Sequence, residues 1–386
     1  MKLDLSIVMP CLNEAETIGT CIAKAQRWLR NNPQIAGEIV IADNGSTDGS
    51  IAIAGLAGAR VVGIPGRGYG SALMGGIAAA RGEFVIMGDA DDSYDFSDLT
   101  PFFLKLQAGF DLVQGCRLPA GGGTLMKGAM PFLHRWWGNP MFTRLARWWF
   151  RAPLNDIYCG LRGFRKDFQI GLDQRCTGME FATEMVIKSC LHGGKIAEVP
   201  ITLYPDGRKV RGPHLRTFRD GWRTLRFFLL YSPSWLFLAP GAGLGFVGVV
   251  GYAISLPGFV FGGVHFDVHT LLFASVALIC GFQAFTFFMF AKVFAITEGL
   301  IPTTERWQRL FRWINLERGL ILGLLTLAAG IALLGWTFNL WRETGFGSLD
   351  YSRTMRFVIP GATLTAIGFQ AILASFFISV LGLNRR

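Results

Sequence analysis

The stretch Phe84-Val-Ile-Met-Gly-Asp-Ala-Asp-Asp92 places three aspartates directly after a short apolar run. At the exit of a strand, the carboxylates of Asp89 and Asp91 can turn toward one hard cation. Neighbouring carboxylates repel one another unless a cation offsets their charge. Mg²⁺ and Mn²⁺ accept oxygen ligands of this kind, together with diphosphate oxygens and water. An Asp-x-Asp pair alone is a weak signal, so its meaning depends on the residues around it.

The same alternation of strand-like and helix-like patterns continues on both sides of this stretch. It predicts a mostly parallel α/β sheet covered by helices. In such sheets, ligands bind beyond the carboxyl ends of the strands. The predicted strands are 5–10, 38–42, 60–62, 84–87 and 111–115, and the predicted helices are 15–31, 48–57, 70–80 and 97–109.

Two more polar motifs follow predicted strands. Pro10-Cys-Leu-Asn13-Glu14 follows the first strand, and Asp43-Asn-Gly-Ser-Thr-Asp-Gly49 follows the second. The second motif has two interpretations: an Asx-rich turn that caps the next helix, or a carboxylate that accepts hydrogen bonds from a nucleobase or a ribose. A third segment, Gly66-Arg-Gly-Tyr-Gly70, is either a turn that opens a glycine-rich helix or a loop that also brings Arg67 to a nucleotide.

The last 150 residues account for the unusual composition of the chain. Hydrophobic residues make up 51% and charged residues 17%, against about 25% charged residues in typical soluble domains. Four windows without a charge each exceed the ~20 residues that cross a bilayer core. They predict four transmembrane helices at about 235–256, 270–291, 320–341 and 357–383.

The charges are unevenly distributed along the chain. Residues 1–126 carry a net charge of −4, residues 127–226 carry +10, and the remainder carries +4. The basic block is interleaved with aromatic residues, which favours an amphipathic helix at about 131–151 lying at an anionic membrane surface over nucleic-acid binding. The loop between the second and third windows is rich in Lys and Arg, so the positive-inside rule places this loop and both termini in the cytoplasm.

Taken together and in this order, the motifs resemble those of family-2 glycosyltransferases of the GT-A fold. Four later segments narrow the resemblance to dolichyl-phosphate-mannose synthases and bacterial polyprenyl-phosphate glycosyltransferases. These segments are Gly115-Cys-Arg117, Asp156-Ile-Tyr-Cys-Gly-Leu-Arg-Gly-Phe-Arg165, Gly178-Met-Glu-Phe-Ala-Thr-Glu184 and Ala197-Glu-Val-Pro-Ile201. The resemblance implies a Rossmann-like GT-A domain over 1–212, a juxtamembrane helix over 213–234 and a transmembrane domain over 235–386.

The resemblance also implies a function and a set of site residues. The chain is expected to transfer a hexose from a UDP- or GDP-sugar to a polyprenyl phosphate with inversion, using Mg²⁺ or Mn²⁺, at the inner or plasma membrane. Asp89 and Asp91 would hold the metal, and with Arg117 they form the expected catalytic set. Arg117 and Lys127 would bind the lipid phosphate. The expected nucleotide-sugar ligands are Pro10, Asn13, Glu14, Asp43, Asn44, Gly45, Ser46, Arg67, Gly68, Ala90, Arg208 and Arg211.

Two departures from the family pattern and two rival functions remain open. Ser93 stands where relatives often offer an amide side chain to the metal, so Asp92 or water could complete the coordination, and Asn44 replaces a commoner aspartate. A processive polysaccharide synthase should carry Gln-x-x-Arg-Trp, and Gln308-Arg-Leu-Phe-Arg-Trp313 has one residue too many. A nucleotide-sugar-sensing transporter or lipid-binding membrane protein should carry ionisable residues inside its spans, and the four windows have none.

Overall fold

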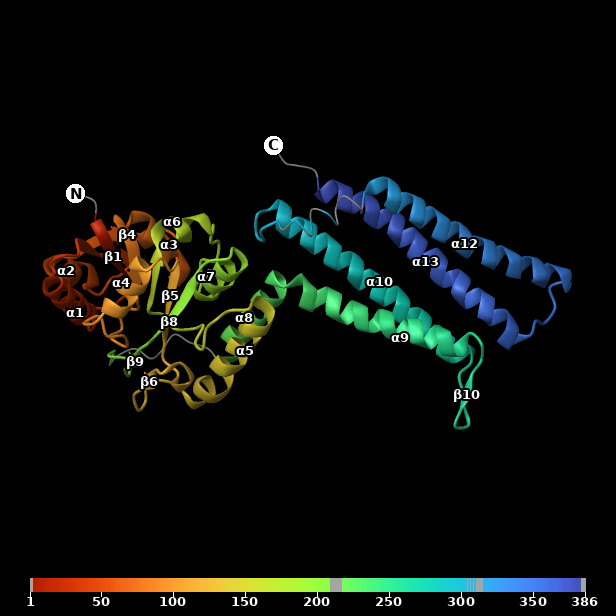
Figure 1. The fold of residues 1–386 in the computed structure, drawn as a ribbon, viewed down its shortest axis with the longest axis horizontal. Coiled ribbons are helices and arrows are strands. Elements are labelled where there is room, and N and C mark those ends of the chain that lie inside the picture. Colours follow the sequence, from red (N-terminus) through yellow and green to blue (C-terminus); the bar gives the residue numbers. More distant parts are fainter. Residues whose placement is uncertain are drawn as a thin grey trace. The chain divides into compact units, whose positions relative to one another are not determined.

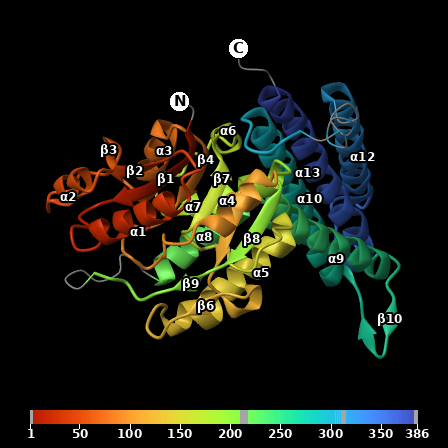
Figure 2. The ribbon, with the colours of Figure 1, turned by 60° about the vertical axis from the view of Figure 1, so that its left-hand side comes forward.

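A computed structural model describes residues 3–208, 217–303, 305, 307, 309 and 315–382, apart from the side chains of 217–220. The chain divides into two compact units, an N-terminal unit of Met1–Phe228 and a C-terminal unit of Leu229–Arg386. The division falls inside the segment that the sequence predicts as a juxtamembrane helix. Figures 1 and 2 show the elements of each unit.

A seven-stranded sheet in the order β3-β2-β1-β4-β7-β5-β8 forms the centre of the N-terminal unit. Every strand pair is parallel except the two made by β7, which runs antiparallel to β4 and β5. The mostly parallel GT-A-like sheet expected from the alternating pattern is therefore confirmed. The strands are β1 Leu3–Cys11, β2 Gly37–Asp43, β3 Arg60–Gly63, β4 Gly82–Met87, β5 Leu112–Cys116, β7 Arg162–Arg165 and β8 Ile196–Pro200.

Helices pack on both faces of this sheet because the strand residues alternate between them. On one face, Leu5, Ile7 and Met9 of β1 join a core with Ile18 and Ile22. On the other face, a Cβ on Gly76 would lie 2.7 Å from the Val8 side chain, so that helix approaches the sheet closely. The helices are α1 Ile18–Asn31, α2 Ser50–Leu56, α3 Tyr69–Ala79, α4 Thr100–Gln107, α6 Lys166–Gly171 and α7 Glu180–Leu191.

Two further helices form an aromatic cluster beside the sheet. They are α5 (Asn139–Phe150), which follows the π-helical turn His134–Gly138, and α8 (Thr217–Tyr231). Phe228 of α8 is fully buried, with ring centroids 5.5 Å from Phe150 and 6.0 Å from Phe142. This half of α8 therefore packs as part of the N-terminal unit. A short two-stranded sheet, β6 Thr124–Leu125 with β9 Thr202–Leu203, and a 3-10 turn, Pro119–Gly121, complete the unit.

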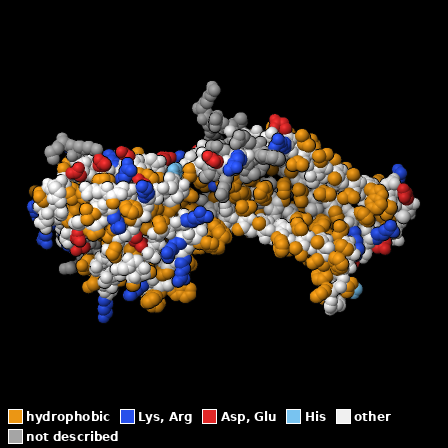
Figure 3. Space-filling model, in the orientation of Figure 1, with side chains coloured by type: hydrophobic (Ala, Val, Ile, Leu, Met, Phe, Trp, Pro, Cys, Tyr) orange, Lys and Arg blue, Asp and Glu red, His pale blue; other side chains and the backbone are white. Residues whose placement is uncertain are grey.

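The C-terminal unit contains four helices that are long and apolar enough to cross a membrane, found by searching the described residues. The four predicted transmembrane helices are therefore confirmed. Figure 3 shows hydrophobic side chains covering the flanks of these helices. The membrane helices are Ser234–Ser255 (a π-helical turn followed by α9 Ala239–Ser255), α10 Val268–Thr297, α12 Leu316–Glu343 and α13 Tyr351–Leu381. A hairpin of β10 Val260–Phe261 and β11 Val264–His265 joins α9 to α10.

Glycines allow close contact inside each pair of membrane helices. Gly323 and Gly330 of α12 face Gly368 and Gly361 of α13, and a Cβ on Gly330 would lie 2.5 Å from the Thr365 nitrogen. Gly241 and Gly248 of α9 approach α10 in the same way. Small residues of this kind are what let helix backbones pack in lipid.

Candidate functional site

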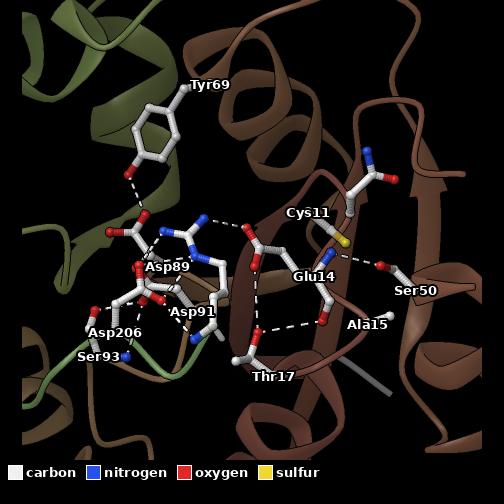
Figure 4. A network of polar contacts seen from close by, with 12 residues as sticks. Cys11, Glu14, Ala15, Thr17, Ser50, Tyr69, Asp89, Asp91, Ser93 and Asp206 are labelled. Atoms are coloured by element: carbon white, nitrogen blue, oxygen red, sulfur yellow. Dashed lines mark hydrogen bonds and ion pairs between the residues drawn. The ribbon is translucent and has the colours of Figure 1, made fainter. Parts of the chain in front are cut away.

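The polar motifs predicted at the strand ends meet at one edge of the sheet. β1 lies between β2 and β4, and all three run parallel, with Cys11 opposite Asp43 and Val8 opposite Met87. Because parallel strands end at the same edge, the segments that begin at Asn13, Asn44 and Asp89 come together there. Figure 4 shows part of this edge.

Asp43 organises the turn after β2. Its buried carboxylate accepts hydrogen bonds from the backbone N–H groups of Gly45 at 3.0 Å and Ser46 at 3.2 Å. These contacts form the Asx turn that was one of the two interpretations of this motif. Its role as a nucleoside ligand stays a prediction.

The turns after β1 and β2 fix each other. The Asn13 N–H donates to Ser46 Oγ at 2.9 Å, and the Asn13 side-chain oxygen accepts from the Thr47 N–H at 2.7 Å. Asn13 has a φ of 61°, a left-handed conformation that asparagine tolerates better than most residues. Pro10, the last residue but one of β1, is half-buried, and Gly45 is exposed with a φ of 94°.

Asn44 holds the glycine loop in place. Its amide donates to the Gly66 carbonyl at 2.6 Å, and its oxygen accepts from the Gly68 N–H at 2.7 Å. Gly68 has a φ of 124°, and a Cβ there would collide with the Thr177 carbonyl. Glycine is therefore required at Gly68 by both conformation and space, while Arg67 is exposed.

Asp89 is held by a residue that the sequence analysis passed over. The Tyr69 hydroxyl, carried by the first turn of α3, donates to Asp89 Oδ1 at 2.8 Å. Burial, with the charge of Asp91 second, raises the pKa of Asp89 to about 6, and the Tyr69 hydrogen bond opposes that rise. On the other side of the carboxylate, a Cβ on Gly160 would lie 2.6 Å from Asp89 Oδ2. Ala90, the next residue, is buried.

Asp91 and Asp92 are held by different side chains. Asp91 Oδ1 accepts from the Ser93 N–H at 3.0 Å and from the Ser93 hydroxyl at 2.6 Å. Asp92 is paired with Lys24 at 2.8 Å. Of the two protein groups considered for a third metal ligand, Ser93 therefore bonds Asp91 and Asp92 bonds Lys24.

Arg208 connects three acidic side chains at this edge. Its guanidinium lies 3.1 Å from Glu14 Oε1 and 3.6 Å from Asp91 Oδ2, and its Nε donates to Asp206 at 2.9 Å. Burial raises the pKa of Glu14 to about 7, although the charge of Arg208 lowers it. Of the predicted ligands, Arg208 thus contacts both Glu14 and Asp91, whereas Arg211 lies outside the described residues.

Arg117 directly follows β5 and forms a buried ion pair with Asp156. Its Nε and Nη2 donate to the two oxygens of Asp156 at 2.7 and 2.9 Å, and its N–H donates to Asp156 at 3.1 Å. Burial opposes the charge of Asp156, but the guanidinium and its hydrogen bonds hold the pKa of that carboxyl below its usual value. The positive charge of Arg117 also lowers the pKa of Asp89. Contact of Arg117 with a phosphate stays a prediction, as does the role of Lys127, which lies on an exposed turn after β6.

Sequence reasoning missed three residues that support the site: Tyr69, Asp206 and Arg162. Arg162 is fully buried and donates to the backbone carbonyls of Cys159 at 2.8 Å, Ile157 at 3.0 Å and Ala182. Tyr69 lay inside the quoted glycine motif, and Asp206 lies two residues before Arg208. A polar residue next to a motif was the one signal that could have identified these two.

The residues that could hold a divalent cation are Asp89 and Asp91. Within the described ranges, no group of three or more His, Cys, Asp or Glu side chains is arranged to hold a metal ion. Asp89 and Asp91 suit a divalent cation because of their charge: the repulsion between the two carboxylates contributes to the raised pKa of Asp89. A cation bound with diphosphate oxygens as its other ligands relieves that repulsion.

A basic and aromatic surface lies on the predicted amphipathic segment. Phe132, Trp136, Trp137 and Trp148 are 59–73% exposed, and the Arg135 guanidinium stacks over Trp136 at 5.3 Å. Large exposed apolar groups rimmed by arginine are typical of a membrane-contacting surface.

Family models match both units of the chain. Residues 6–170 match glycosyl transferase family 2, and residues 289–382 match the glycosyltransferase family 2 C-terminal transmembrane region.

Curated relatives are similar over nearly all or about half of this chain. The low-salt glycan biosynthesis hexosyltransferase Agl6 of Haloferax volcanii is 35% identical over 380 residues, which span 98% of this chain and 89% of the relative. The dolichyl-phosphate hexose transferase of the same organism is 34% identical over 199 residues, 51% of this chain and 82% of the relative.

Among solved structures, the glucosyl-3-phosphoglycerate synthase of Mycobacterium tuberculosis in complex with Mn²⁺, uridine diphosphate and glucosyl-3-phosphoglycerate is similar to part of this chain. The similarity covers 59% of this chain and 79% of that one, with a TM-score of 0.45 and 22% identity.

Proposed function

The chain belongs to glycosyltransferase family 2, and from that premise we propose that it transfers a hexose from a nucleotide sugar to a polyprenyl phosphate. The family match and the full-length hexosyltransferase relative confirm the resemblance read from the motifs. The protein is a membrane glycosyltransferase. The identities of donor, acceptor and metal go beyond this and form the proposal.

The main support for the proposal is that one chain combines an acidic edge of the sheet with four membrane helices. Asp89 and Asp91 lie beside Glu14 and Arg208, where a nucleoside diphosphate would need both a cation and a guanidinium. A lipid acceptor explains why such an enzyme carries a membrane unit. One relative is named dolichyl-phosphate hexose transferase, which supports this acceptor class.

In the proposed donor complex, the paired turns after β1 and β2 receive the nucleoside. Asn13, Asp43 and Ser46 are held together by the hydrogen bonds described above, so these turns are organised before the ligand binds. The glycine loop, fixed by Asn44, contributes backbone N–H groups and Arg67. Preorganised donors lose little entropy on binding.

Asp89 and Asp91 would hold Mg²⁺ or Mn²⁺ with the donor diphosphate. The bound cation would offset the charge of the departing nucleoside diphosphate. Tyr69 keeps Asp89 in orientation, and Ser93 does the same for Asp91. Arg208 supplies a second positive charge at the same place.

The acceptor phosphate needs no general base. A phosphate monoester already carries about −1.5 to −2 charge at neutral pH, so positioning and charge stabilisation account for the catalysis. We assign this positioning to Arg117 and Lys127, and we propose attack on the sugar C1 with inversion. The basic and aromatic surface of the amphipathic segment 131–151 would lie at the membrane, with the N-terminal unit and both termini in the cytoplasm.

The rival functions have less support. The candidate segment of a processive synthase, Gln308–Trp313, has one residue too many for the Gln-x-x-Arg-Trp motif; it lies almost entirely outside the described residues. A sensing transporter is disfavoured because the four windows 235–256, 270–291, 320–341 and 357–383 contain no charged residue, and Lys292 and Arg356 lie just outside them.

The test is transfer of label from a nucleotide sugar into lipid. Membranes that contain the protein would be incubated with polyprenyl phosphate, Mg²⁺ or Mn²⁺, and a panel of labelled UDP- and GDP-sugars. We expect an organic-soluble product from at least one donor, with inverted anomeric configuration. Label in a polymer would support the processive synthase, and no transfer from any donor would contradict the proposal.

The matched pair for this assay is Asp91→Asn and Asp95→Asn. Asp95 accepts from the Ser97 N–H and hydroxyl as Asp91 accepts from those of Ser93, so both substitutions disturb the same kind of turn. We expect Asp91→Asn to lower transfer at least ~100-fold, by analogy with loss of one charge-stabilising group, while Asp95→Asn retains most activity. Equal effects would remove Asp91 from the metal site.

A further inference from the structure

Arg208 occupies a central position among the carboxylates of the donor site. Its guanidinium reaches Glu14 after β1, Asp91 after β4 and Asp206 after β9, three segments that are distant in sequence. The side chain of Arg208 is only 11% exposed, as is that of Glu14. An arginine fork that bridges carboxylates in a half-buried place forms stronger hydrogen bonds than an exposed ion pair.

The backbone that carries Arg208 is attached to the metal-binding segment itself. The Tyr204 N–H donates to the Ser93 carbonyl at 3.0 Å, and the Gly207 N–H donates to the Asp91 carbonyl at 2.9 Å. A Cβ on Gly207 would lie 3.1 Å from Thr17 and 3.2 Å from the Asp91 carbonyl, so the segment is closely packed. The guanidinium can therefore change partners by rotation of its side chain while its backbone stays in place.

We propose that Arg208 is an internal counter-cation of the donor site. Before the donor binds, its guanidinium neutralises Glu14 and Asp91. When the donor and the metal ion bind, the guanidinium moves to pair with the donor diphosphate, and the metal ion replaces it at the Asp91 carboxylate. This inference rests on the proposed function of the site as a metal and nucleotide-sugar site. It adds an exchange of ion-pair partners among four charged groups: Arg208, Asp91, the metal ion and the diphosphate.

The exchange follows from the cost of leaving a half-buried charge unpaired. A metal ion that binds alone must displace Arg208 from Asp91 and leaves the guanidinium without part of its ion pair, which is unfavourable. A metal ion that binds with a diphosphate brings a new anion for Arg208, and guanidinium pairs well with phosphate oxygens. Metal and diphosphate should therefore bind cooperatively, with Arg208 as part of the coupling.

The test measures two affinities on the purified full-length protein without acceptor lipid. The Kd of Mn²⁺ alone is measured by electron paramagnetic resonance of free Mn²⁺, and the Kd of UDP and of GDP is measured by calorimetry at saturating Mn²⁺. For Arg208→Gln we expect opposite changes: Mn²⁺ alone binds about fivefold more tightly, and the diphosphate binds about tenfold more weakly, both within the usual range of coupling between sites.

Two further variants separate the exchange from general electrostatics. Arg208→Lys keeps the charge but loses the fork, so Mn²⁺ binding should stay within about twofold of the unaltered protein while diphosphate binding weakens. Lys24→Gln removes a positive charge that pairs with the adjacent Asp92. It should leave diphosphate affinity within about twofold, because Lys24 is not assigned to the diphosphate.

The sign of the two changes decides the outcome. Weaker or unchanged Mn²⁺ binding in Arg208→Gln would overturn the exchange, and so would tighter Mn²⁺ binding with no loss of diphosphate affinity. Unaltered protein that binds neither Mn²⁺ nor either diphosphate would overturn the proposed function together with the exchange. Normal binding of both, with changes of the same sign in the variant, would overturn the exchange alone.

Discussion

Both units of the chain place glycine against neighbouring backbone, but they secure the contact in different ways. In the N-terminal unit, Gly68 and Gly70 lie against the carbonyls of residues 176–178, and Ser71 N–H donates to the Thr177 carbonyl at 3.1 Å. That segment is in turn held by the buried carboxylate of Glu184, which accepts from the Cys176 N–H at 2.8 Å. Buried charge thus fixes the loop.

In the C-terminal unit, the corresponding contacts are backbone against backbone. Gly323 faces Gly368 and Gly330 faces Gly361. Inside the unit, α9, α10 and α13 also share a cluster of three hydroxyls, and at the start of α10 Asp267 pairs with Arg356 of α13 at 3.2 Å. Tyr252 bonds Ser275 at 2.9 Å and Thr363 at 2.8 Å, and Ser275 bonds Thr363. In lipid, close van der Waals contact replaces buried ion pairs as the main means of attachment.

The comparison indicates which kind of substitution should destabilise each unit most. Loss of one charged partner should be most harmful in the N-terminal unit, because the remaining charge stays buried and unpaired. Added bulk should be most harmful between the membrane helices. Four predictions test this difference.

The largest effect is expected from Arg117→Ala. Removing the guanidinium leaves the buried Asp156 carboxylate without the positive charge of Arg117. This loss should cost about 3–5 kcal/mol of stability. The matched control is Arg165→Ala, which removes a 48% exposed partner of Asp111 and should cost at most about 1 kcal/mol. Thermal unfolding of the purified protein would check both, and equal losses would show that the buried pair does not stabilise the N-terminal unit.

Added bulk at Gly330 should have the next largest effect. In Gly330→Val the new side chain meets the Thr365 nitrogen and the Gly361 carbonyl, so α12 and α13 must separate, at a cost of about 1–3 kcal/mol. Gly335→Val on the same helix has nothing within 4 Å of its Cβ and is the control. Disulfide cross-linking between cysteines introduced into the two helices would measure the separation. Equal cross-linking in both variants would contradict the glycine contact.

Tyr69→Phe should weaken metal binding and shift its pH dependence. Metal competes with a proton for Asp89, whose pKa is raised to about 6, so Mn²⁺ affinity should fall as the pH is lowered through that value. Tyr69 donates to the carboxylate and lowers this pKa, so its loss should move the fall to higher pH and weaken binding about tenfold near neutrality.

The control for this experiment is Tyr158→Phe, because Tyr158 is also buried but its hydroxyl bonds Thr224. Its Mn²⁺ titration should keep the midpoint of the unaltered protein. A Tyr69→Phe midpoint that stays in place would show that the hydroxyl does not act on Asp89.

The smallest effect is expected from Thr363→Val. The substitution removes one hydroxyl from the three-helix cluster, and hydrogen bonds between membrane helices average about 0.6 kcal/mol. Thr326→Val is the control, since that hydroxyl bonds only Leu322 of its own helix among the contacts of the described residues. A loss above about 2 kcal/mol for Thr363→Val would show that the membrane unit depends on polar contacts as strongly as the N-terminal unit.

Patterns local in sequence predicted much of the fold. Apolar runs marked β1, β2 and β4 and the four membrane helices, and parallel strands necessarily bring Asn13, Asp43 and Asp89 to one edge. The antiparallel strand β7 was not predicted, because Arg162–Arg165 is a four-residue strand with an arginine at each end. Its place between β4 and β5 is decided by pairing, which no local pattern contains.

The sequence predicted that polar residues gather at the carboxyl edge of the sheet, but it did not predict the contacts among them. Tyr69 reaches Asp89 because residues 176–178, a hundred positions later, determine the path of the glycine loop. Arg208 meets Glu14 across 194 positions of sequence. The side-chain partners of Arg117 and Asp92 likewise come from distant segments, so a motif identifies the group but not the charge that it faces.

The aromatic cluster around Phe228 has a practical consequence for where this chain can be cut. Phe228 covers Phe142, Phe150 and Trp149, all on α5 and all upstream of residue 212, where the motifs alone would end the enzymatic domain. A soluble fragment that stops there would leave those rings uncovered beside an already apolar surface and should aggregate. A fragment that runs through Tyr231 keeps the cluster closed and stops before the first membrane helix.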